Sequence, residues 1–278
     1  GEFQLHSTSE CSETDPAVSV WTDGSFIACW RYEGCGEDAI GCQRFDKEGG
    51  KQGEQFDANQ SPDDNHYAPE VAALEGGGAV VIWEKQGQAD GNGAGVFGRF
   101  FDPEGVAEGG DFLINIHTAG WQEPGAVAAL PGGGFVVAWY GSGNGGPGFD
   151  DQGIFARLYD SDGAGIGGQF RVNSYTVDIQ TMPQVAAAPD GRFVVAWQSE
   201  WQDGTDEGIF FQRFAVDGST VQGEGAANVL TNGPQGLPGL ALFPDGTAVL
   251  SWSGSKPGGT DQCPYARRFA WDGSKLYR

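Results

Sequence analysis

The sequence predicts an all-β protein, a five-bladed β-propeller in which each blade has four strands. A thirteen-residue segment ending in Trp recurs five times along the 278-residue chain. The rest of each repeat consists of short runs rich in Val, Phe and Trp between glycine-containing turns, which is the pattern of short strands. No repeat has the periodicity of an amphipathic helix. Repeats of four antiparallel strands form the blades of propellers, so five repeats predict five blades.

The first two strands of each blade form a hairpin. Gly and Asp in the connecting turn permit the tight backbone that joins two such strands. The five copies are VAALEGGGAVVIW (71–83), VAALPGGGFVVAW (127–139), VAAAPDGRFVVAW (185–197), LALFPDGTAVLSW (240–252) and the weaker VSVWTDGSFIACW (18–30).

Two further strands complete each blade. The third strands are IGCQRFD (40–46), VFGRFFD (96–102), IFARLYD (154–160), IFFQRFA (209–215) and PYARRFA (264–270). The fourth strands are QFDAN (55–59), DFLIN (111–115), QFRVN (169–173) and the degenerate GAAN (225–228). The blades therefore cover about 17–59, 70–115, 126–173, 184–228 and 239–278.

The fifth repeat has no fourth strand of its own. Residues 2–6, EFQLH, match the fourth strands of the other blades. The first and last blades of a closed ring must meet, so we expect this N-terminal strand to complete the fifth blade. A domain boundary inside the ring would separate neighbouring blades, and residues 1–278 are therefore predicted to form a single domain.

The charge of the chain limits its partners. It has 15 Lys and Arg against 38 Asp and Glu, a net charge of -23. Such a surface repels nucleic-acid phosphates and anionic lipids, so neither is expected as a partner. No apolar stretch is long enough for a membrane helix, and no signal peptide is present. We expect a secreted or cell-surface protein in its mature form, whose acidic residues bind cations or serve solubility.

The repeats also resemble a known class of sequence. The pattern G-G-F-V-V-A-W, followed by G-I-F, A-x-R-x-x-D and F-x-V-N, resembles repeats of large secreted or surface-anchored bacterial proteins, often neighbours of calcium-binding repeat arrays. The resemblance covers nearly the whole chain and implies architecture, not a reaction. The blade number is similar to that of five-bladed lectins of the tachylectin type. Sugar binding is implied by this similarity of shape alone, because the blade sequences differ.

A polar residue stands seven positions after the last residue of each fourth strand. One interpretation is a ring of groups around the central funnel that binds sugar hydroxyls. The alternative, which we favour, is that these side chains cap the connections between blades by bonding backbone groups. The candidate ligand-binding residues at these stations are Glu13, His66, Gln122, Gln180 and Gln235.

Tryptophans fall into two groups. The five that end the second strands are expected to fill the spaces between blades, because a large aromatic at the same place in every repeat is usually buried. Trp121 and Trp201 break the repeat and lie in or beside loops, so they are the better candidates for stacking on a sugar.

The loops between second and third strands carry acidic residues. Carboxylates, loop carbonyls and Gly-permitted turns are what a Ca²⁺ shell of oxygen ligands requires. The loop QSEWQDGTDEGIF is predicted to bind Ca²⁺ best, and the alternative is a solvated acidic turn. The candidate ligands are Asp203, Asp206 and Glu207 there, with Asp90 and Asp151 in other blades.

Catalytic motifs are weak in this sequence. The three histidines show no metal-binding spacing, and no nucleophile elbow is present. We therefore expect no enzyme but a binding module, with carbohydrate as the leading ligand and another extracellular protein, in a structural or assembly role, as the alternative. A glycoside hydrolase is the second alternative, because carboxylates that line a funnel, such as Glu13 and Glu123, serve that chemistry.

Five cysteines leave at least one unpaired within the chain. Cys11, Cys35 and Cys263 fall in loops of one face, whereas Cys29 and Cys42 replace mostly small residues of the other blades. We expect a disulfide between Cys11 and Cys263 that holds the N-terminal strand, a second between Cys35 and Cys42, and a buried Cys29 thiol.

Overall fold

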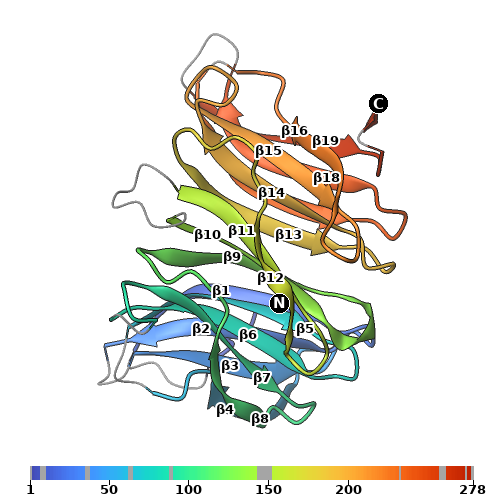
Figure 1. The fold of residues 1–278 in the computed structure, drawn as a ribbon. Coiled ribbons are helices and arrows are strands. Elements are labelled where there is room, and N and C mark those ends of the chain that lie inside the picture. Colours follow the sequence, from blue (N-terminus) through green and yellow to red (C-terminus); the bar gives the residue numbers. More distant parts are fainter. Residues whose placement is uncertain are drawn as a thin grey trace.

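The computed structural model describes residues 2–6, 11–34, 38–61, 65–87, 90–142, 152–231, 233–256, 261–272 and 274–276. These residues form five antiparallel four-stranded sheets, one from each repeat (Figure 1). A single 3-10 turn, η1 (Pro131–Gly133), is the helical element assigned within them. None of the described helices is long and apolar enough to cross a membrane.

Each sheet follows the chain order of its strands. The first contains β1 (Ser12–Val20), β2 (Phe26–Glu33), β3 (Ala39–Phe45) and β4 (Lys51–Asp57), and the second β5 (His66–Ala73), β6 (Ala79–Lys85), β7 (Gly95–Phe101) and β8 (Ala107–Leu113). The third contains β9 (Gln122–Ala129), β10 (Phe135–Ser142), β11 (Gln152–Tyr159) and β12 (Gly165–Arg171), and the fourth β13 (Gln180–Ala187), β14 (Phe193–Glu200), β15 (Glu207–Phe214) and β16 (Thr220–Ala226). The fifth contains β17 (Gln235–Leu242), β18 (Ala248–Ser255), β19 (Gln262–Phe269) and β20 (Lys275–Leu276).

The sheets are arranged like the blades of a propeller. Their first strands contact one another in chain order, β1 with β5, β5 with β9, β9 with β13 and β13 with β17. The first strands therefore line the axis and the fourth strands lie outside. Closure of the ring between β17 and β1 remains a prediction, as does the single domain.

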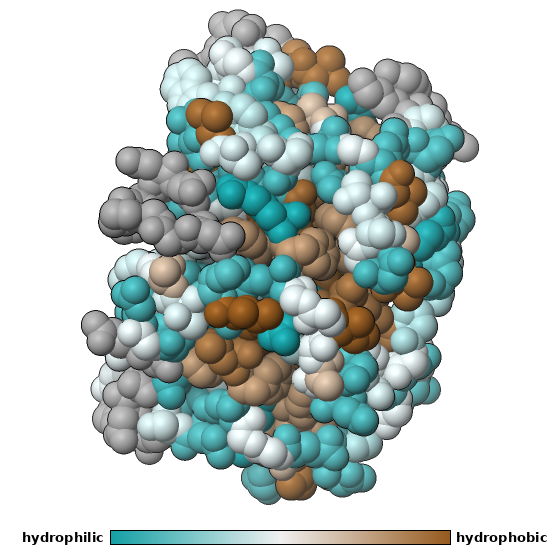
Figure 2. Space-filling model, in the orientation of Figure 1, coloured by the Kyte–Doolittle hydropathy of each residue, from teal (hydrophilic) through white to brown (hydrophobic). Residues whose placement is uncertain are grey.

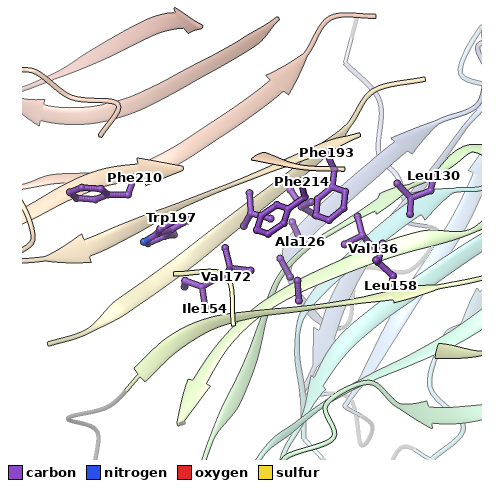
Figure 3. Close-up of a cluster of buried hydrophobic side chains, with 14 residues drawn as sticks. Ala126, Leu130, Val136, Ile154, Leu158, Val172, Phe193, Trp197, Phe210 and Phe214 are labelled. Atoms are coloured by element: carbon purple, nitrogen blue, oxygen red, sulfur yellow. The ribbon is translucent and has the colours of Figure 1, made fainter. Parts of the chain in front are cut away.

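The core consists of layers between neighbouring blades. In each layer, residues of two sheets enclose the repeated Trp of a second strand, as expected: Trp83, Trp139 and Trp197 have no exposed surface. Figure 3 shows the layer between the third and fourth sheets, where Val136 and Val172 meet Phe193 and Trp197. Burial of these aromatic side chains holds adjacent sheets together.

The N-terminal strand is not found where we expected it. β20 takes the fourth place in the fifth sheet, where it pairs with Arg268 and Phe269 of β19. Residues 2–6 form no strand and lie against the first sheet instead. Phe3 packs on Phe45 at 5.6 Å between ring centroids, and Leu5 packs against the cluster of Trp30 and Tyr32. These apolar contacts account for the position of the segment.

Candidate active site

Buried amides cap the connections between blades. In the second blade, Asn115 Oδ1 accepts a bond of 2.8 Å from Val96 N, and Asn115 Nδ2 donates to Gln122 Oε1 at 3.1 Å. Gln122 Nε2 in turn donates to Ala119 O. The same seven-residue pairing recurs in Asn173 with Gln180 at 2.8 Å and Asn228 with Gln235 at 2.9 Å.

The predicted ligand-binding residues at these stations are used by the fold. Gln122, Gln180, Gln235 and His66 have at most 1% exposed surface. His66 Nδ1 lies 3.1 Å from Asp38 O, and His66 packs edge-on against Trp83. Glu13 Oε1 lies 3.1 Å from His6 Nδ1. These are the contacts of the capping interpretation, because each side chain bonds a backbone group or its seven-residue partner.

The two unrepeated tryptophans are exposed but belong to different blade connections. Trp121 precedes β9 and is 42% exposed, and Trp201 follows β14 and is 54% exposed. Trp201 has a φ of 57° and opens a turn in which its N–H donates to Asp206 O at 2.6 Å.

The acidic loops use their carboxylates as turn acceptors. Asp203 Oδ2 accepts a bond of 2.8 Å from Asn228 Nδ2, and Asp203 Oδ1 accepts from Thr205 N. Asp90 accepts equivalent bonds from Asn115 Nδ2 and Asn92 N. No group of three or more His, Cys, Asp or Glu side chains placed to hold a metal occurs within the described part of the chain. Asp151 lies outside that part, and calcium binding, including that by Asp206 and Glu207, stays a prediction.

Both predicted disulfides are wrong. Cys29 bonds Cys42, its direct partner across β2 and β3, with a Cα–Cα separation of 4.1 Å. Cys263 is a free thiol, so it does not hold Cys11, which is itself disulfide-bonded. Cys35 lies outside the described residues. The signal was present in the sequence, because Cys29 and Cys42 occupy the places of Ile82 and Gly98, which are also cross-strand partners.

The side chains that differ most between blades directly follow the repeated Trp of the second strands. Two residues of each blade are called its mouth positions here. One directly follows the repeated Trp of the second strand, and the other is its cross-strand partner in the first strand. They pair Thr14 with Arg31, Tyr67 with Glu84, Glu123 with Tyr140, Thr181 with Gln198 and Gly236 with Ser253. All five pairs lie at the end of the funnel where the first strands begin.

Glu84 is the most perturbed carboxyl group at the mouth. It is 5% exposed, and burial, together with the charge of Glu123, raises the pKa of Glu84 to about 7 against an opposing bond from Gln86. Gln86 Nε2 donates to Glu84 Oε1 at 2.9 Å. A carboxyl group that holds its proton near neutral pH is suited to act as a general acid.

Glu123 occupies a different environment in the neighbouring blade. The Tyr140 hydroxyl donates a short hydrogen bond to Glu123 Oε2. Burial, this bond and the charges of Glu123 and Glu84 raise the pKa of Tyr140 above its ordinary value, so the phenol stays a neutral donor. A carboxylate held by a donor is suited to act as a base or nucleophile.

A cationic group, Arg31, occupies a mouth position of the first blade and stacks on Tyr67, the cross-strand partner of Glu84. Arg31 NH2 donates to Asp38 Oδ2 at 2.8 Å, and the Arg31 guanidinium lies 4.1 Å from the centre of the Tyr67 ring. Arg31 also contacts Glu33. The mouth positions of the first three blades are thus one Arg, two Glu, two Tyr and one Thr.

Sequence reasoning found one of the two carboxyl groups of this cluster. Glu123 was a candidate, but its expected partner Glu13 pairs with His6. Glu84 and Tyr140 were missed. The available signal was their place directly after the repeated Trp, where the other repeats carry Arg, Gln or Ser.

A hollow lies at the opposite end of the funnel. Its volume is 740 Å³, and the turns between first and second strands of four blades line it. Trp21 and Arg44 stack there at 4.3 Å, among Ala, Leu and Pro side chains. Its lining carboxyl groups, Asp23 and Glu75, accept bonds from Ser25 and from Gly132 N. The mouth is the better candidate for catalysis because Glu84, with its strongly raised pKa, lies there.

The sequence matches no known family profile and no curated protein. Solved structures nevertheless share its fold. A protein of unknown function from Dyadobacter fermentans has a TM-score of 0.65 at 12% identity, over 97% of this chain and 82% of its own. An endo-arabinase from Bacteroides thetaiotaomicron has a TM-score of 0.53 at 15% identity, over 95% and 94%. An α-L-arabinanase from Penicillium chrysogenum, complexed with arabinobiose, has a TM-score of 0.59 at 11% identity, over 87% and 77%.

These neighbours confirm the propeller-type fold and correct the functional expectation. Two of the three are named as enzymes, an endo-arabinase and an α-L-arabinanase, whereas we expected a lectin-like module without enzymatic activity. The lectin-like module without enzymatic activity is therefore wrong as the main interpretation. At these identities the likeness shows the fold alone, so the residues at the mouth must carry any argument about activity.

Proposed function

We propose that this protein is a glycoside hydrolase whose catalytic carboxyl groups are Glu84 and Glu123. The observation that carries the proposal is the contrast between the two groups. Glu84 is buried and its pKa is raised to about 7, while Glu123, whose charge contributes to that rise, accepts a bond from Tyr140. A pair of carboxyl groups, one of them with a raised pKa, is the usual requirement for cleaving a glycosidic bond.

The roles follow from these environments. Glu84, whose pKa is raised to about 7, keeps a proton in a large share of the molecules at neutral pH and gives it to the oxygen of the departing sugar. Glu123 is the carboxylate that either attacks the anomeric carbon or takes a proton from the attacking water. Tyr140 orients Glu123 through its hydrogen bond. It does not transfer its proton, because the pKa of its phenol is raised. The net reaction adds water across the bond, with its proton on the leaving oxygen and its hydroxyl on the anomeric carbon.

The choice of substrate rests on the fold neighbours. Two proteins of similar fold are named as an endo-arabinase and an α-L-arabinanase, the second solved with arabinobiose, and another is named as a xylan β-1,4-xylosidase. We therefore propose a polysaccharide containing arabinose as the first substrate to test. A polysaccharide substrate agrees with an extracellular location, which itself stays a prediction.

The test is a screen of polysaccharides with matched variants. Wild-type protein is incubated with arabinan, arabinoxylan, xylan and galactan, and newly formed reducing ends are measured. We expect release from at least one of them, and a loss of about 10²-fold to 10⁴-fold in Glu84→Gln and Glu123→Gln. Gln198→Ala, which alters the equivalent position of the fourth blade, is the control and should retain activity. Absence of hydrolysis with every polymer, or equal rates in all variants, would contradict the proposal.

A further inference from the structure

The first strands of four blades share one irregularity next to the mouth. In each of them, two residues form a bulge opposite the repeated Trp of the second strand. The first bulge residue has a positive φ of 47° to 57°, a left-handed backbone that is unfavourable for a residue with a side chain. The second bulge residue is proline. The four residues with the left-handed backbone are Asp15, Ala68, Met182 and Leu237.

The third blade, which carries Glu123, departs from this plan. Its bulge is Pro124 followed by Gly125, so proline stands one residue earlier than in the other blades. Proline fixes φ at about −65° and cannot adopt the left-handed backbone. Neither Pro124 nor Gly125 has a positive φ, and Pro124 lies directly opposite Trp139 in the ladder. Glu123 itself now precedes proline, which holds its own backbone in an extended conformation.

Gly125 lets this bulge lie against the neighbouring blade. A Cβ atom added to Gly125 would lie 2.3 Å from Pro183 Cγ and 2.4 Å from Pro183 O of β13. Both distances are far shorter than van der Waals contact, so a side chain here would force β9 and β13 apart. Glycine permits such a close approach of two backbones. The position of β9 therefore depends on the absence of a side chain at residue 125.

The two kinds of bulge also differ in exposure. Met182 and Leu237 are 42% and 68% exposed, and other exposed apolar side chains lie scattered among polar ones over the surface (Figure 2). Pro124, at the same place in the third blade, is buried. The third blade therefore has no exposed side chain directly after Glu123.

The first-strand mouth position is the place where the preceding blade makes contact. The Arg31 guanidinium lies 4.1 Å from the centre of the Tyr67 ring. Gln198 Oε1 lies 2.7 Å from the point where a Cβ atom of Gly236 would stand. In both pairs, a second-strand mouth residue contacts the first-strand mouth residue of the next blade. The third blade has Glu123 at this place.

Glu123 accordingly interacts with residues of two blades. The Tyr140 hydroxyl of its own blade donates a hydrogen bond to Glu123 Oε2. The charge of Glu123 acts on Glu84 of the preceding blade. Both interactions depend on where β9 holds the Glu123 side chain, and the unusual bulge begins at the next residue.

We propose that the unusual bulge of the third blade positions the Glu123 carboxylate between Tyr140 and Glu84. Pro124 restricts the backbone of Glu123, and Gly125 allows β9 to lie close against β13. Both are positioning residues, because they act through Glu123. The catalytic consequence rests on the proposed function, whereas the placement of Glu123 is measurable without a substrate.

An exchange of bulges between blades tests this role. Pro124→Ala combined with Gly125→Pro gives the third blade the Ala-Pro order of the second. This order of a non-proline residue and proline occurs in four blades, so the variant should fold while Glu123 loses its contacts. We expect the titration midpoint of Glu84, followed by carbon NMR, to fall by at least about half as much as in Glu123→Gln. On a polymer that the wild-type protein hydrolyses, kcat should fall by about 10-fold to 10²-fold, with KM changed by less than about 2-fold.

The matched control makes the reverse exchange in the fifth blade. Leu237→Pro combined with Pro238→Gly installs the third-blade order beside mouth positions that have no carboxyl group. It should leave the Glu84 midpoint and kcat unchanged. Gly125→Ala is a second, smaller change in the third blade. Its added methyl group must move β9 away from Pro183, so the Glu84 midpoint should fall in this variant too.

Failure of this inference is distinguishable from failure of the proposed function. A wild-type protein without hydrolytic activity would contradict the function, while the Glu84 midpoint would still report the placement of Glu123. An unchanged Glu84 midpoint in both third-blade variants would overturn the positioning role. An equal loss of kcat in the third-blade exchange and in the fifth-blade control would overturn it as well.

Discussion

The second and fourth blades have the same backbone plan and different chemistry at the mouth of the funnel. Both cap their connections with an Asn whose Oδ1 accepts a third-strand N–H at 2.8 to 2.9 Å. At the mouth, however, the second blade has Glu84 where the fourth has Gln198. The residues that repeat satisfy the backbone, and the residue that departs from the repeat has a strongly raised pKa. A residue that departs from the repeat, as Glu84 does, is therefore the better candidate for catalysis.

Removing a repeated Trp should have the largest effect on stability. Trp139 is fully buried, so Trp139→Ala should lower the free energy of unfolding by about 4 kcal/mol through lost burial and a cavity. The matched change at an unrepeated, exposed residue, Trp121→Ala, should cost less than about 0.5 kcal/mol. Denaturant titration of both variants measures the difference. Similar losses would mean that repetition does not identify the core.

The dependence of stability on pH should single out Glu84. Burial raises the pKa of Glu84 and of Glu70 to about 7, from an ordinary value of 4.5. Between these values the folded protein holds protons that the unfolded chain releases, so the free energy of unfolding falls as pH rises from about 4.5 to about 7. Glu84→Gln should remove up to about 3 kcal/mol of this fall. Denaturant midpoints at both pH values measure it, and an unchanged fall would contradict the raised pKa.

Breaking the amide network should have a smaller effect. Asn115→Ala removes the acceptor of the Val96 N–H and the donor to Gln122, which leaves buried polar groups without their bonds. We expect a loss of about 2 kcal/mol. Asn92→Ala, in the exposed loop nearby, is the control and should change stability by less than about 0.5 kcal/mol. A loss as small as that of the control would show that the repeated amides are not structural.

Calcium should have the smallest effect on stability. If the loop of Asp203, Asp206 and Glu207 binds Ca²⁺, millimolar Ca²⁺ should stabilise the protein by about 1 kcal/mol relative to EDTA, through binding to the folded state alone. Asp203→Asn combined with Asp206→Asn should abolish this gain. Thermal melts of both proteins with and without Ca²⁺ measure it. Identical melting of the wild-type protein in both conditions would leave these residues as turn acceptors.

The sequence predicted what depends on local pattern and missed what depends on contacts between blades. Strand order, turns and the seven-residue pairing of Asn115 with Gln122 follow from spacing within one repeat. The raised pKa of Glu84 depends on burial against the next blade and on Glu123, which spacing within a repeat does not reveal. The bond between Cys29 and Cys42 was missed because loop positions were compared in place of cross-strand register. The contacts of residues 2–6 likewise depend on a neighbouring blade.

The central claim is that the mouth of the funnel holds a carboxyl group, Glu84, whose pKa is raised by burial and by the charge of Glu123. Carbon NMR of the glutamate side chains, titrated from pH 3 to pH 9, tests it most directly, with Glu84→Gln and Glu123→Gln used for assignment. We predict that the Glu84 signal titrates near pH 7 and that its midpoint falls when Glu123→Gln removes the neighbouring charge. A Glu84 midpoint near 4.5, unchanged in that variant, would contradict the account.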